Sequence, residues 1–242
     1  MWKGKTVSLV FPAYNEEEGI KKSIDDFSST GVIDEIVVVN NNSTDGTVEE
    51  AKKTNARIVN EYNKGYGHAV QRGLREAAGD YIIMSEPEGT FVGKDAIKLL
   101  TYMDDDFDAV FGTRTSKELI WSGAKMSWFW RLGNWFLGKV IEYLFNGPCL
   151  TDAGGGMKLF KKETIRKIQD KFTVGGSHFG PEIMILLIKN KFKVVEIPIN
   201  YRERLGRSKI SGYFWKALIL GFQNLYLIFK YRLGLVRPKK FR

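Results

Sequence analysis

Short apolar runs alternate with amphipathic stretches along the first half of the chain. The runs are five or six residues long and rich in β-branched residues, which is typical of buried strands: Thr6–Phe11, Glu35–Val39, Ala56–Asn60, Asp80–Met84 and Ala109–Thr113. The stretches between them have helical spacing: Glu16–Ser28, Thr44–Asn55, Gly65–Ala78 and Gly93–Tyr102. This alternation predicts an α/β fold in which helices cover both faces of a mostly parallel sheet.

Polar clusters follow three of these predicted strands: residues 12–16, residues 40–43 and Glu86-Pro87-Glu88. In open sheets of this kind, ligands bind outside the carboxyl ends of the strands. Glu86 and Glu88 have the layout of a divalent-cation site, because Mg²⁺ and Mn²⁺ prefer oxygen ligands. Taken alone, such an acidic pair is more often a solvated turn. Three polar clusters on one rim favour a site.

Each cluster also has a purely structural interpretation. Asn15 and Ser43 or Thr44 would cap helices. Residues 63–67 would form a Gly-rich turn into a helix, or a loop that brings helix N–H groups to a phosphate. This loop lacks the full dinucleotide fingerprint, so we reject a nicotinamide-binding interpretation. With two histidines in the chain, a zinc site or a Ser-His-Asp triad has little to build on.

The second half of the chain is rich in aromatic residues. Trp121, Trp128 and Trp135 recur every seven residues, which places them on one predicted helical face. Such a stripe is typical of a core face, or of a membrane interface. A second helix is predicted over Gly212–Tyr231, and its longest uncharged stretch has 13 residues. Since a bilayer span needs roughly 20 residues, this helix is expected to lie in an interface or to pack against a partner.

The net charge of +9 is concentrated at one end of the chain. Residues 202–242 hold eleven Lys or Arg against one acid, a charge of +10, which leaves 26 basic and 27 acidic side chains in the first 201 residues. A basic cluster beside an apolar helix suits anionic lipid or phosphate ligands, and no nucleic-acid partner is expected. Cys149 is the single cysteine, which is compatible with a reducing compartment, and the N-terminus is unlike a cleavable signal peptide.

In sequence order, the clusters resemble family-2 glycosyltransferases of the GT-A fold, and among them the polyprenol-phosphate (dolichol-phosphate) hexosyltransferases. The resemblance is collinear over residues 6–211 and includes Pro12–Glu16, Asn41 with residues 43–47, Gly65 and Gly67 with Ala69, residues 79–81, residues 112–114, Asp152 with Gly156, residues 196–199 and residues 204–209. It implies a Rossmann-like GT-A domain over residues 1–211. Residues 212–242 would then form a basic, apolar membrane-interface segment.

The resemblance also implies roles for individual residues. The donor nucleotide sugar would be bound by Pro12, Tyr14, Glu16, Asn41, Lys64, Gly65 and Arg114. Mg²⁺ or Mn²⁺ would be held by Glu86, Glu88 and Thr90. The acceptor phosphate would be bound by Arg131, Arg204, Ser208 and Lys209, with Asp152, Arg204 and Lys209 as the catalytic set.

Two departures from the family pattern carry information. The family's Asp-x-Asp is spelled Glu86 and Glu88, and Thr90 stands where a Gln often helps to hold the metal, so a cation would sit farther from the strand end. Asn40 and Asn41 replace the usual Asp pair of the nucleoside turn. An amide can both accept from uracil N3–H and donate to its O4, which favours a UDP-sugar over a GDP-sugar.

The expected reaction is an inverting transfer of a hexose, from UDP-glucose or GDP-mannose, to a polyprenyl phosphate. A phosphate acceptor is largely ionised near neutral pH and needs little general-base help, which favours an orienting or metal-side role for Asp152 over that of an essential base. With a sugar hydroxyl as acceptor, Asp152 becomes the leading base. Peripheral attachment to the cytoplasmic face of a membrane is expected, with a membrane protein as a further candidate partner. The alternatives are a transferase with a saccharide or soluble acceptor, and a non-catalytic nucleotide-sugar binding module.

Overall fold

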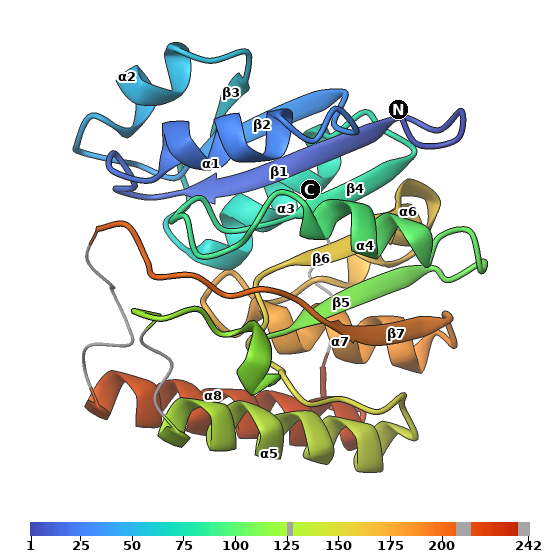
Figure 1. The fold of residues 1–242 in the computed structure, drawn as a ribbon. Helices are drawn as coiled ribbons and strands as arrows, with labels where there is room; N and C mark the ends of the chain where they lie inside the picture. Colours follow the sequence, from blue (N-terminus) through green and yellow to red (C-terminus); the bar gives the residue numbers. More distant parts are fainter. Residues whose placement is uncertain (125–127, 207–213, 237–242) are drawn as a thin grey trace.

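The structure, a computed structural model, describes residues 1–124, 128–206 and 214–236. At its centre lies a seven-stranded sheet with the order β3-β2-β1-β4-β6-β5-β7 (Figure 1). The strands are β1 (Val7–Ala13), β2 (Glu35–Asn40), β3 (Arg57–Asn60), β4 (Tyr81–Met84), β5 (Ala109–Thr113), β6 (Lys158–Lys161) and β7 (Val194–Pro198). Strand β6 pairs antiparallel with both of its neighbours, and every other pairing is parallel. The predicted mostly parallel sheet is therefore confirmed.

Helices cover both faces of the sheet and bury two hydrophobic clusters (Figure 1). One cluster lies under α1 (Ile20–Ser28), α2 (Thr47–Lys52) and α4 (Asp95–Thr101). The other lies under α3 (Tyr66–Glu76), α5 (Trp128–Phe145), α6 (Lys162–Ile168), α7 (Phe179–Lys189) and α8 (Phe214–Arg232). Two short 3-10 helices, Lys117–Leu119 and Gln169–Lys171, complete the described elements. Alternating strand residues supply each cluster, as the twofold side-chain period of a strand requires.

The five strands predicted in the first half are present with nearly the predicted bounds. Helices α1 and α2 begin later than predicted, at Ile20 and Thr47. The residues expected to cap them join the two loops to each other instead: the Asn15 N–H donates to Ser43 Oγ (3.1 Å), and the Thr44 N–H donates to Asn15 Oδ1 (2.8 Å). The loops after β1 and β2 thereby form one rigid rim.

Strands β6 and β7 and helices α6 and α7 were not predicted. Strand β6 is four residues long and begins with a buried lysine, Lys158, so its apolar pattern is too short to recognise. Helix α7 is buried along ten of its eleven residues, which removes the polar face that marks an amphipathic helix.

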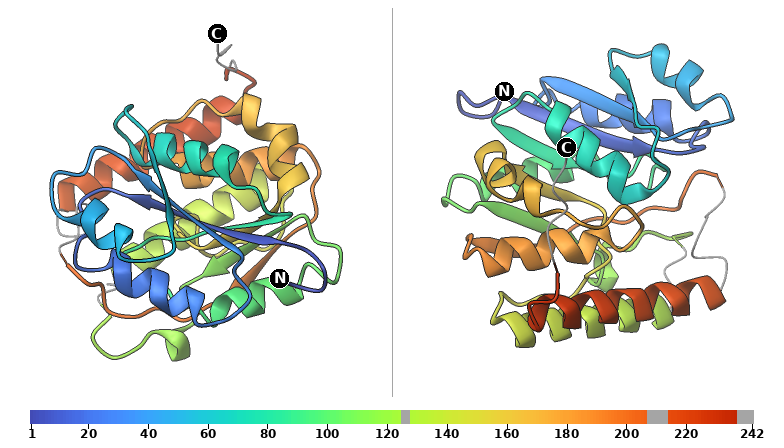
Figure 2. Two further views of the ribbon diagram at one scale, coloured as in Figure 1. Left: turned by 90° about the horizontal axis from the view of Figure 1, so that it is seen from above. Right: turned by 180° about the vertical axis from the view of Figure 1, so that it is seen from behind.

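Helices α5 and α8 lie side by side beyond the β7 edge of the sheet (Figures 1 and 2). Trp121 does not belong to α5, so the predicted stripe of three tryptophans on one helix is wrong. Gly123 has a positive φ of 91°, which is incompatible with a helix continuing from Trp121. The indole Nε1–H of Trp121 donates to Asn200 Oδ1 (3.1 Å).

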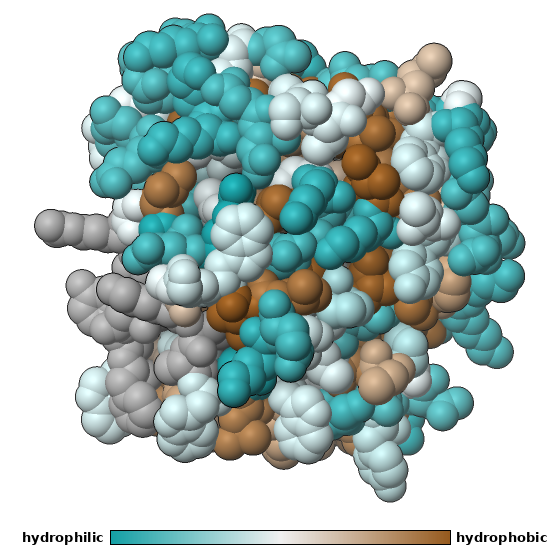
Figure 3. Space-filling model, in the orientation of Figure 1, coloured by the Kyte–Doolittle hydropathy of each residue, from teal (hydrophilic) through white to brown (hydrophobic). Residues whose placement is uncertain are grey.

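The α5–α8 pair is unlike the opposite end of the molecule. Figure 3 shows hydrophilic residues gathered over the α2 end, while pale and apolar residues are more frequent towards α5. Among the described residues, neither of these helices, nor any other, has the length and apolar character needed to span a bilayer. Helix α8 nevertheless contributes Leu227, Ile228 and Tyr231 to the core that covers the sheet, and is packed on α7.

Candidate active site

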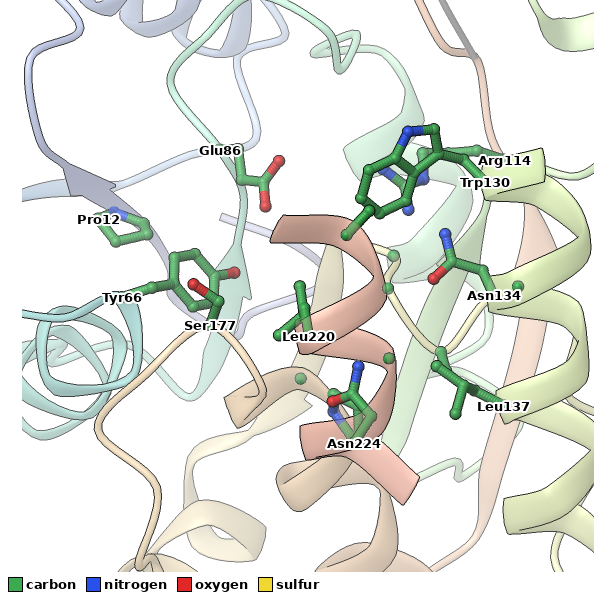
Figure 4. A pocket seen from close by; sticks show the side chains of 18 of the residues that line it. Pro12, Tyr66, Glu86, Arg114, Trp130, Asn134, Leu137, Ser177, Leu220 and Asn224 are labelled. Atoms are coloured by element: carbon green, nitrogen blue, oxygen red, sulfur yellow. The ribbon is translucent and has the colours of Figure 1, made fainter. Parts of the chain in front are cut away.

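A cavity of about 780 Å³ opens at the carboxyl ends of β1, β2, β4 and β5. One half is polar and lies against the loops after these strands. The other half continues between α5 and α8, as Figure 4 shows: Glu86 and Tyr66 face Leu220 of α8 and Asn134 of α5. Since β6 runs antiparallel, the loop that precedes it, residues 152–157, reaches the same rim.

Glu86 and Glu88 follow β4 and line the polar half. Burial raises the pKa of Glu86, with Arg114 and Arg204 opposing the rise. Burial, and then the neighbouring Glu86 carboxylate, raise the pKa of Glu88 to about 8. The Thr90 hydroxyl donates to Glu88 Oε1 (3.1 Å), so Thr90 orients this carboxylate. Two neighbouring buried carboxyl groups do not both ionise readily, so a bound positive charge would favour their ionised forms. We call this pair of carboxylates the seat.

This seat fits a divalent cation. An Arg204 guanidinium nitrogen already lies against Glu88, so the position accepts a cation. Among the residues that the structure describes, no group of three or more His, Cys, Asp and Glu side chains is placed to hold a metal ion. A cation bound by Glu86 and Glu88 would therefore complete its shell with substrate phosphates and water, which is the usual manner of Mg²⁺.

A network of buried charges lies beside the carboxylates. Arg114 donates to Asp152 through its backbone N–H (3.1 Å), Nε (2.8 Å) and Nη2 (3.0 Å). Burial acts to raise the pKa of Asp152, but the Arg114 guanidinium holds it below its ordinary value. Asp152 is therefore a weak base, already occupied in orienting Arg114. Glu196 of β7 in turn accepts from the Thr151 and Asp152 N–H groups, at 2.6 and 3.1 Å, and so fixes the turn that carries Asp152.

Lys158, at the start of β6, completes this network. Its side chain is buried, and its Nζ donates to the Gly155 carbonyl. Burial lowers its pKa to about 8, while the nearby Asp152 and Glu86 carboxylates favour its charged form. The residue was not among the predicted site residues. A lysine inside the apolar run Met157–Phe160 is the signal that marks it.

The predicted donor residues line the polar half of the cavity together: Pro12, Tyr14, Glu16, Asn41, Lys64, Gly65 and Arg114. Asn41 has a different part from the predicted one. Its Nδ2 donates to the Glu61 and Asn63 carbonyls (2.9 and 2.8 Å), and its Oδ1 accepts from the Gly65 N–H (2.8 Å). With both of its N–H groups used, the amide holds the loop of residues 61–65 and has no donor left for a base.

Gly65 is required where this loop enters α3. Its φ of 138° is rarely adopted by residues with a side chain, and an added Cβ would lie 2.3 Å from the Gly175 carbonyl oxygen. The next residue, Tyr66, turns its phenol towards Glu86 and Ser177 in the cavity (Figure 4). Burial, followed by the Glu86 and Glu88 carboxylates, raises the pKa of Tyr66. Sequence reasoning did not assign Tyr66 or Ser177 to the site.

The predicted acceptor residues are only partly brought together. Arg204 lines the cavity and pairs with Glu16 Oε1 (2.8 Å) and with Glu88. Arg131, in the first turn of α5, donates to the Thr115 carbonyl (3.0 Å). Ser208 and Lys209 lie outside the described residues.

The far half of the cavity is apolar. It is lined by Phe136 and Leu137 of α5 and by Leu220 and Leu225 of α8. Gly133 and Gly221 also line this half, and a Cβ added at either would meet open space, so neither residue closes the passage. Asn224 Oδ1 is buried here without a hydrogen-bond partner.

A polar site outside the carboxyl ends of a mostly parallel sheet is the usual position of a ligand site in open α/β folds. The chain matches glycosyl transferase family 2 over residues 8–169, which is more than half of its length, and it belongs to that family. It is 29% identical over 216 residues to the low-salt glycan biosynthesis hexosyltransferase Agl6 of Haloferax volcanii, covering 86% of this chain and half of the relative. It is 28% identical to the dolichyl-phosphate hexose transferase of the same organism, covering 88% of this chain and 90% of the relative.

Solved structures share the fold. Glucosyl-3-phosphoglycerate synthase from Mycobacterium tuberculosis, in complex with Mn²⁺, uridine-diphosphate and phosphoglyceric acid, superposes with a TM-score of 0.71 at 18% identity. The superposition covers 98% of this chain and 81% of the synthase. The superposition confirms the predicted GT-A fold, and the family match confirms the glycosyltransferase class.

Proposed function

We propose that this glycosyltransferase moves a hexose from a nucleotide-diphosphate sugar to a polyprenyl phosphate, with inversion at the anomeric carbon. The observation that carries the proposal is the continuous cavity, polar at Glu86 and Glu88 and apolar between α5 and α8. Such a cavity suits an acceptor that has a phosphate at one end and a hydrocarbon chain at the other. The similarity to a dolichyl-phosphate hexose transferase supports the same acceptor class.

The chemistry needs one nucleophile and one leaving group. An acceptor phosphate oxygen attacks the anomeric carbon, and the bond from that carbon to the β-phosphate oxygen of the donor breaks. The nucleoside diphosphate leaves with the bonding electron pair. A phosphate monoester has a second pKa of about 6, so no proton has to be removed from it near neutral pH. The low pKa of Asp152 is consistent with a site that has no strong base there.

The residues of the chain bind and orient the reactants in this proposal. Pro12, Tyr14, Lys64 and Gly65 line the donor side, and Asp152 holds Arg114 at the edge of the cavity. Glu86 and Glu88 would hold Mg²⁺ or Mn²⁺, with Thr90 orienting Glu88. When bound, the cation neutralises charge on the leaving diphosphate.

The acceptor phosphate is assigned to Arg131 and Arg204, with Ser208 and Lys209 retained from the sequence. Guanidinium groups bind phosphate through paired, charge-assisted hydrogen bonds. Arg131 lies in the first turn of α5, next to Trp130, and α5 forms one wall of the apolar passage. A phosphate at Arg131 would therefore direct its chain between α5 and α8.

For the donor, UDP-glucose comes first and GDP-mannose second. The structure removes the earlier argument for UDP, because Asn41 has no free donor for uracil. UDP-glucose is still tested first because the structurally similar synthase binds uridine-diphosphate.

Peripheral attachment to a membrane, on its cytoplasmic face, is part of the proposal. Helices α5 and α8 expose large apolar side chains, including Trp128 (74% exposed), Trp215 (72%) and Phe222 (64%). Trp and Phe side chains on the apolar face of a surface helix suit the boundary between headgroups and acyl chains. These side chains support attachment; the choice of face stays a prediction, as does a membrane-protein partner.

The test is a transfer assay with the purified protein. Polyprenyl phosphate is incubated with Mg²⁺ or Mn²⁺ and separately with UDP-glucose and GDP-mannose, and lipid products are separated and weighed by mass spectrometry. We expect the parent protein to form a glycolipid from one of the donors. The variant Glu88→Ala should show no turnover that depends on the divalent cation. Absence of a lipid-linked sugar with every donor would refute the proposal. Transfer to 3-phosphoglycerate or to a saccharide would favour the alternative of a soluble acceptor. Donor binding without turnover would favour a non-catalytic binding module.

A further inference from the structure

Arg204 occupies the carboxylate seat of the proposed cation. One terminal nitrogen, Nη2, donates to Glu16 Oε1 (2.8 Å), and the other, Nη1, pairs with Glu88 Oε2. Glu16 follows β1 and Glu88 follows β4, so the guanidinium joins two neighbouring strand ends. The Glu16 and Glu88 side chains are only 10% and 11% exposed. Removing one partner from a pair this shielded from water would leave an uncompensated buried charge, so each carboxylate needs the guanidinium or another cation.

The chain around Arg204 is attached to the same loop. The Leu205 N–H donates to the Glu88 carbonyl (2.9 Å), and the Arg202 N–H donates to the Thr90 carbonyl (2.8 Å). Gly89, at a φ of 79°, leaves room for Leu205, since an added Cβ would lie 2.8 Å from Leu205 Cδ1. Residues 202–205 therefore run along the loop that carries Glu88, and a change at Glu88 acts directly on Arg204.

Arg204 lies against Oε2 of Glu88 and the Thr90 hydroxyl donates to Oε1, so a cation bound by this carboxylate has to compete with one of these two partners. Metal ions bind carboxylate oxygen at about 2.0–2.6 Å, which leaves no place for a guanidinium nitrogen on the same lone pairs. Arg204 also cannot escape competition by losing its charge, because guanidinium stays protonated in proteins. A divalent cation on the Oε2 side of Glu88 and the Arg204 guanidinium also repel each other, so the two compete for one position.

We infer that Arg204 is an internal counter-ion that a divalent cation displaces from Glu88, and that its displacement makes its guanidinium available to the acceptor phosphate. The second half of this inference rests on the proposed function. It makes Arg204 an acceptor-binding residue that alternates between two partners, the Glu88 carboxylate and the phosphate. By linkage, metal and phosphate then favour each other's binding, because each draws Arg204 away from the state that excludes the other.

The test measures Mn²⁺ binding to the metal-free protein by electron paramagnetic resonance, without donor or acceptor. Removal of the competitor in Arg204→Gln should tighten Mn²⁺ binding about tenfold or more. Arg202→Gln is the matched control, because it removes the same charge from the same segment. The Arg202 guanidinium pairs with Asp26 (2.6 Å) and not with Glu88. The Mn²⁺ affinity of Arg202→Gln should stay within about threefold of the parent protein.

A second measurement uses inorganic phosphate as the probe. Phosphate at millimolar concentration should tighten Mn²⁺ binding by the parent protein, and this coupling should vanish in Arg204→Gln. Arg204→Lys serves if the glutamine variant does not fold, since a lysine keeps the charge but not the two-pronged contact and should give an intermediate Mn²⁺ affinity.

Unchanged or weaker Mn²⁺ binding by Arg204→Gln would overturn the inference. Equal tightening in Arg202→Gln would overturn it as well, because the effect would then come from loosening the segment. Mn²⁺ binding requires no transfer, so these failures leave the proposed function standing. An absence of glycolipid product, in turn, would leave the displacement of Arg204 by metal intact.

Discussion

Asn41 shows how a residue can lie in the right place and have another task. Its amide holds the loop of residues 61–65 through two donated hydrogen bonds and one accepted bond. Asn41→Asp would replace both donors by an oxygen facing carbonyl oxygens. We expect nucleotide affinity to fall at least about tenfold for uridine and guanosine diphosphates alike, measured by calorimetry.

Asn60→Asp is the matched control for this variant. Asn60 Oδ1 accepts a hydrogen bond from Asn40 Nδ2 (3.0 Å), and an aspartate at this position keeps an acceptor oxygen. Its nucleotide affinity should match that of the parent protein. A change confined to one nucleotide in Asn41→Asp would instead restore the base-contact role predicted from the sequence.

Lys158 makes the stability of the protein depend on pH in a defined window. Its pKa is lowered from an ordinary 10.5 to about 8 in the folded state, so between these values the unfolded chain binds more protons. Stability conferred by this residue therefore rises with pH across that window, by at most about 1.4 kcal/mol per pH unit.

The variant Lys158→Met isolates this contribution. The free energy of unfolding of the parent protein, minus that of the variant, should increase between pH 8 and pH 10 in urea titrations. A difference that is flat with pH would show that Lys158 titrates normally. Other lysines and tyrosines titrate in both proteins, so their effects cancel in the difference.

At this scale, the sequence predicted which residues line the cavity better than it predicted their contacts. The strand-end positions of Glu86, Glu88 and Asn41 follow from the alternation of strands and helices. The pairing of Arg204 with Glu88 does not, because it depends on a segment over a hundred residues away along the chain folding back along the loop after β4.

Among the elements, α8 is fixed at one end by a buried hydrogen bond. The Tyr231 hydroxyl donates to Glu182 Oε1 of α7 (2.8 Å), and Lys189 Nζ donates to the Tyr231 carbonyl (2.9 Å). Tyr231→Phe would leave a carboxylate oxygen of Glu182 with one donor fewer. We expect a loss of about 1–3 kcal/mol in the free energy of unfolding, measured by urea denaturation.

Tyr226→Phe, on the same helix, is the control for this prediction. Tyr226 is 68% exposed, so loss of its hydroxyl should change stability by less than about 0.5 kcal/mol. Equal stabilities of the two variants would show that the Tyr231–Glu182 contact does not anchor α8.

Elements with a regular period were predictable, and the fully buried or very short ones were not. The strands of the first half stand between helices with one polar face, so each boundary is marked. Helix α7 has no such face, and β6 offers four residues with a charge at each end. Their positions are set by tertiary packing around Leu159 and Phe160, which a pattern along the chain does not report.

The molecule as a whole has a hydrophilic end at α2 and an opposite end, at α5 and α8, with exposed aromatic side chains. We expect the protein to sediment with vesicles containing anionic lipid, because α5 and α8 present exposed aromatic side chains. Trp215→Ser combined with Phe222→Ser should lower the bound fraction severalfold.

Tyr62→Ser controls for the loss of an exposed aromatic residue elsewhere. Tyr62 is 79% exposed but belongs to the loop after β3, far along the sheet from α5 and α8. Vesicle binding should be unaffected by this substitution. If the double variant Trp215→Ser with Phe222→Ser binds vesicles as well as the parent protein does, attachment through the α5–α8 face is excluded.

The antiparallel strand β6 has a consequence for how the molecule can vary. The excursion that carries α5 leaves the sheet at β5 and returns on the adjacent β6, where the Gly112 N–H donates to the Met157 carbonyl (2.9 Å) and Thr113 Oγ1 lies 2.8 Å from Thr151 Oγ1. Its two ends are thus clasped together. Changing the length of such a closed loop costs little chain entropy. We expect an exchange of residues 115–150 between family members to alter the acceptor, while Arg114 and the rest of the donor side stay in place.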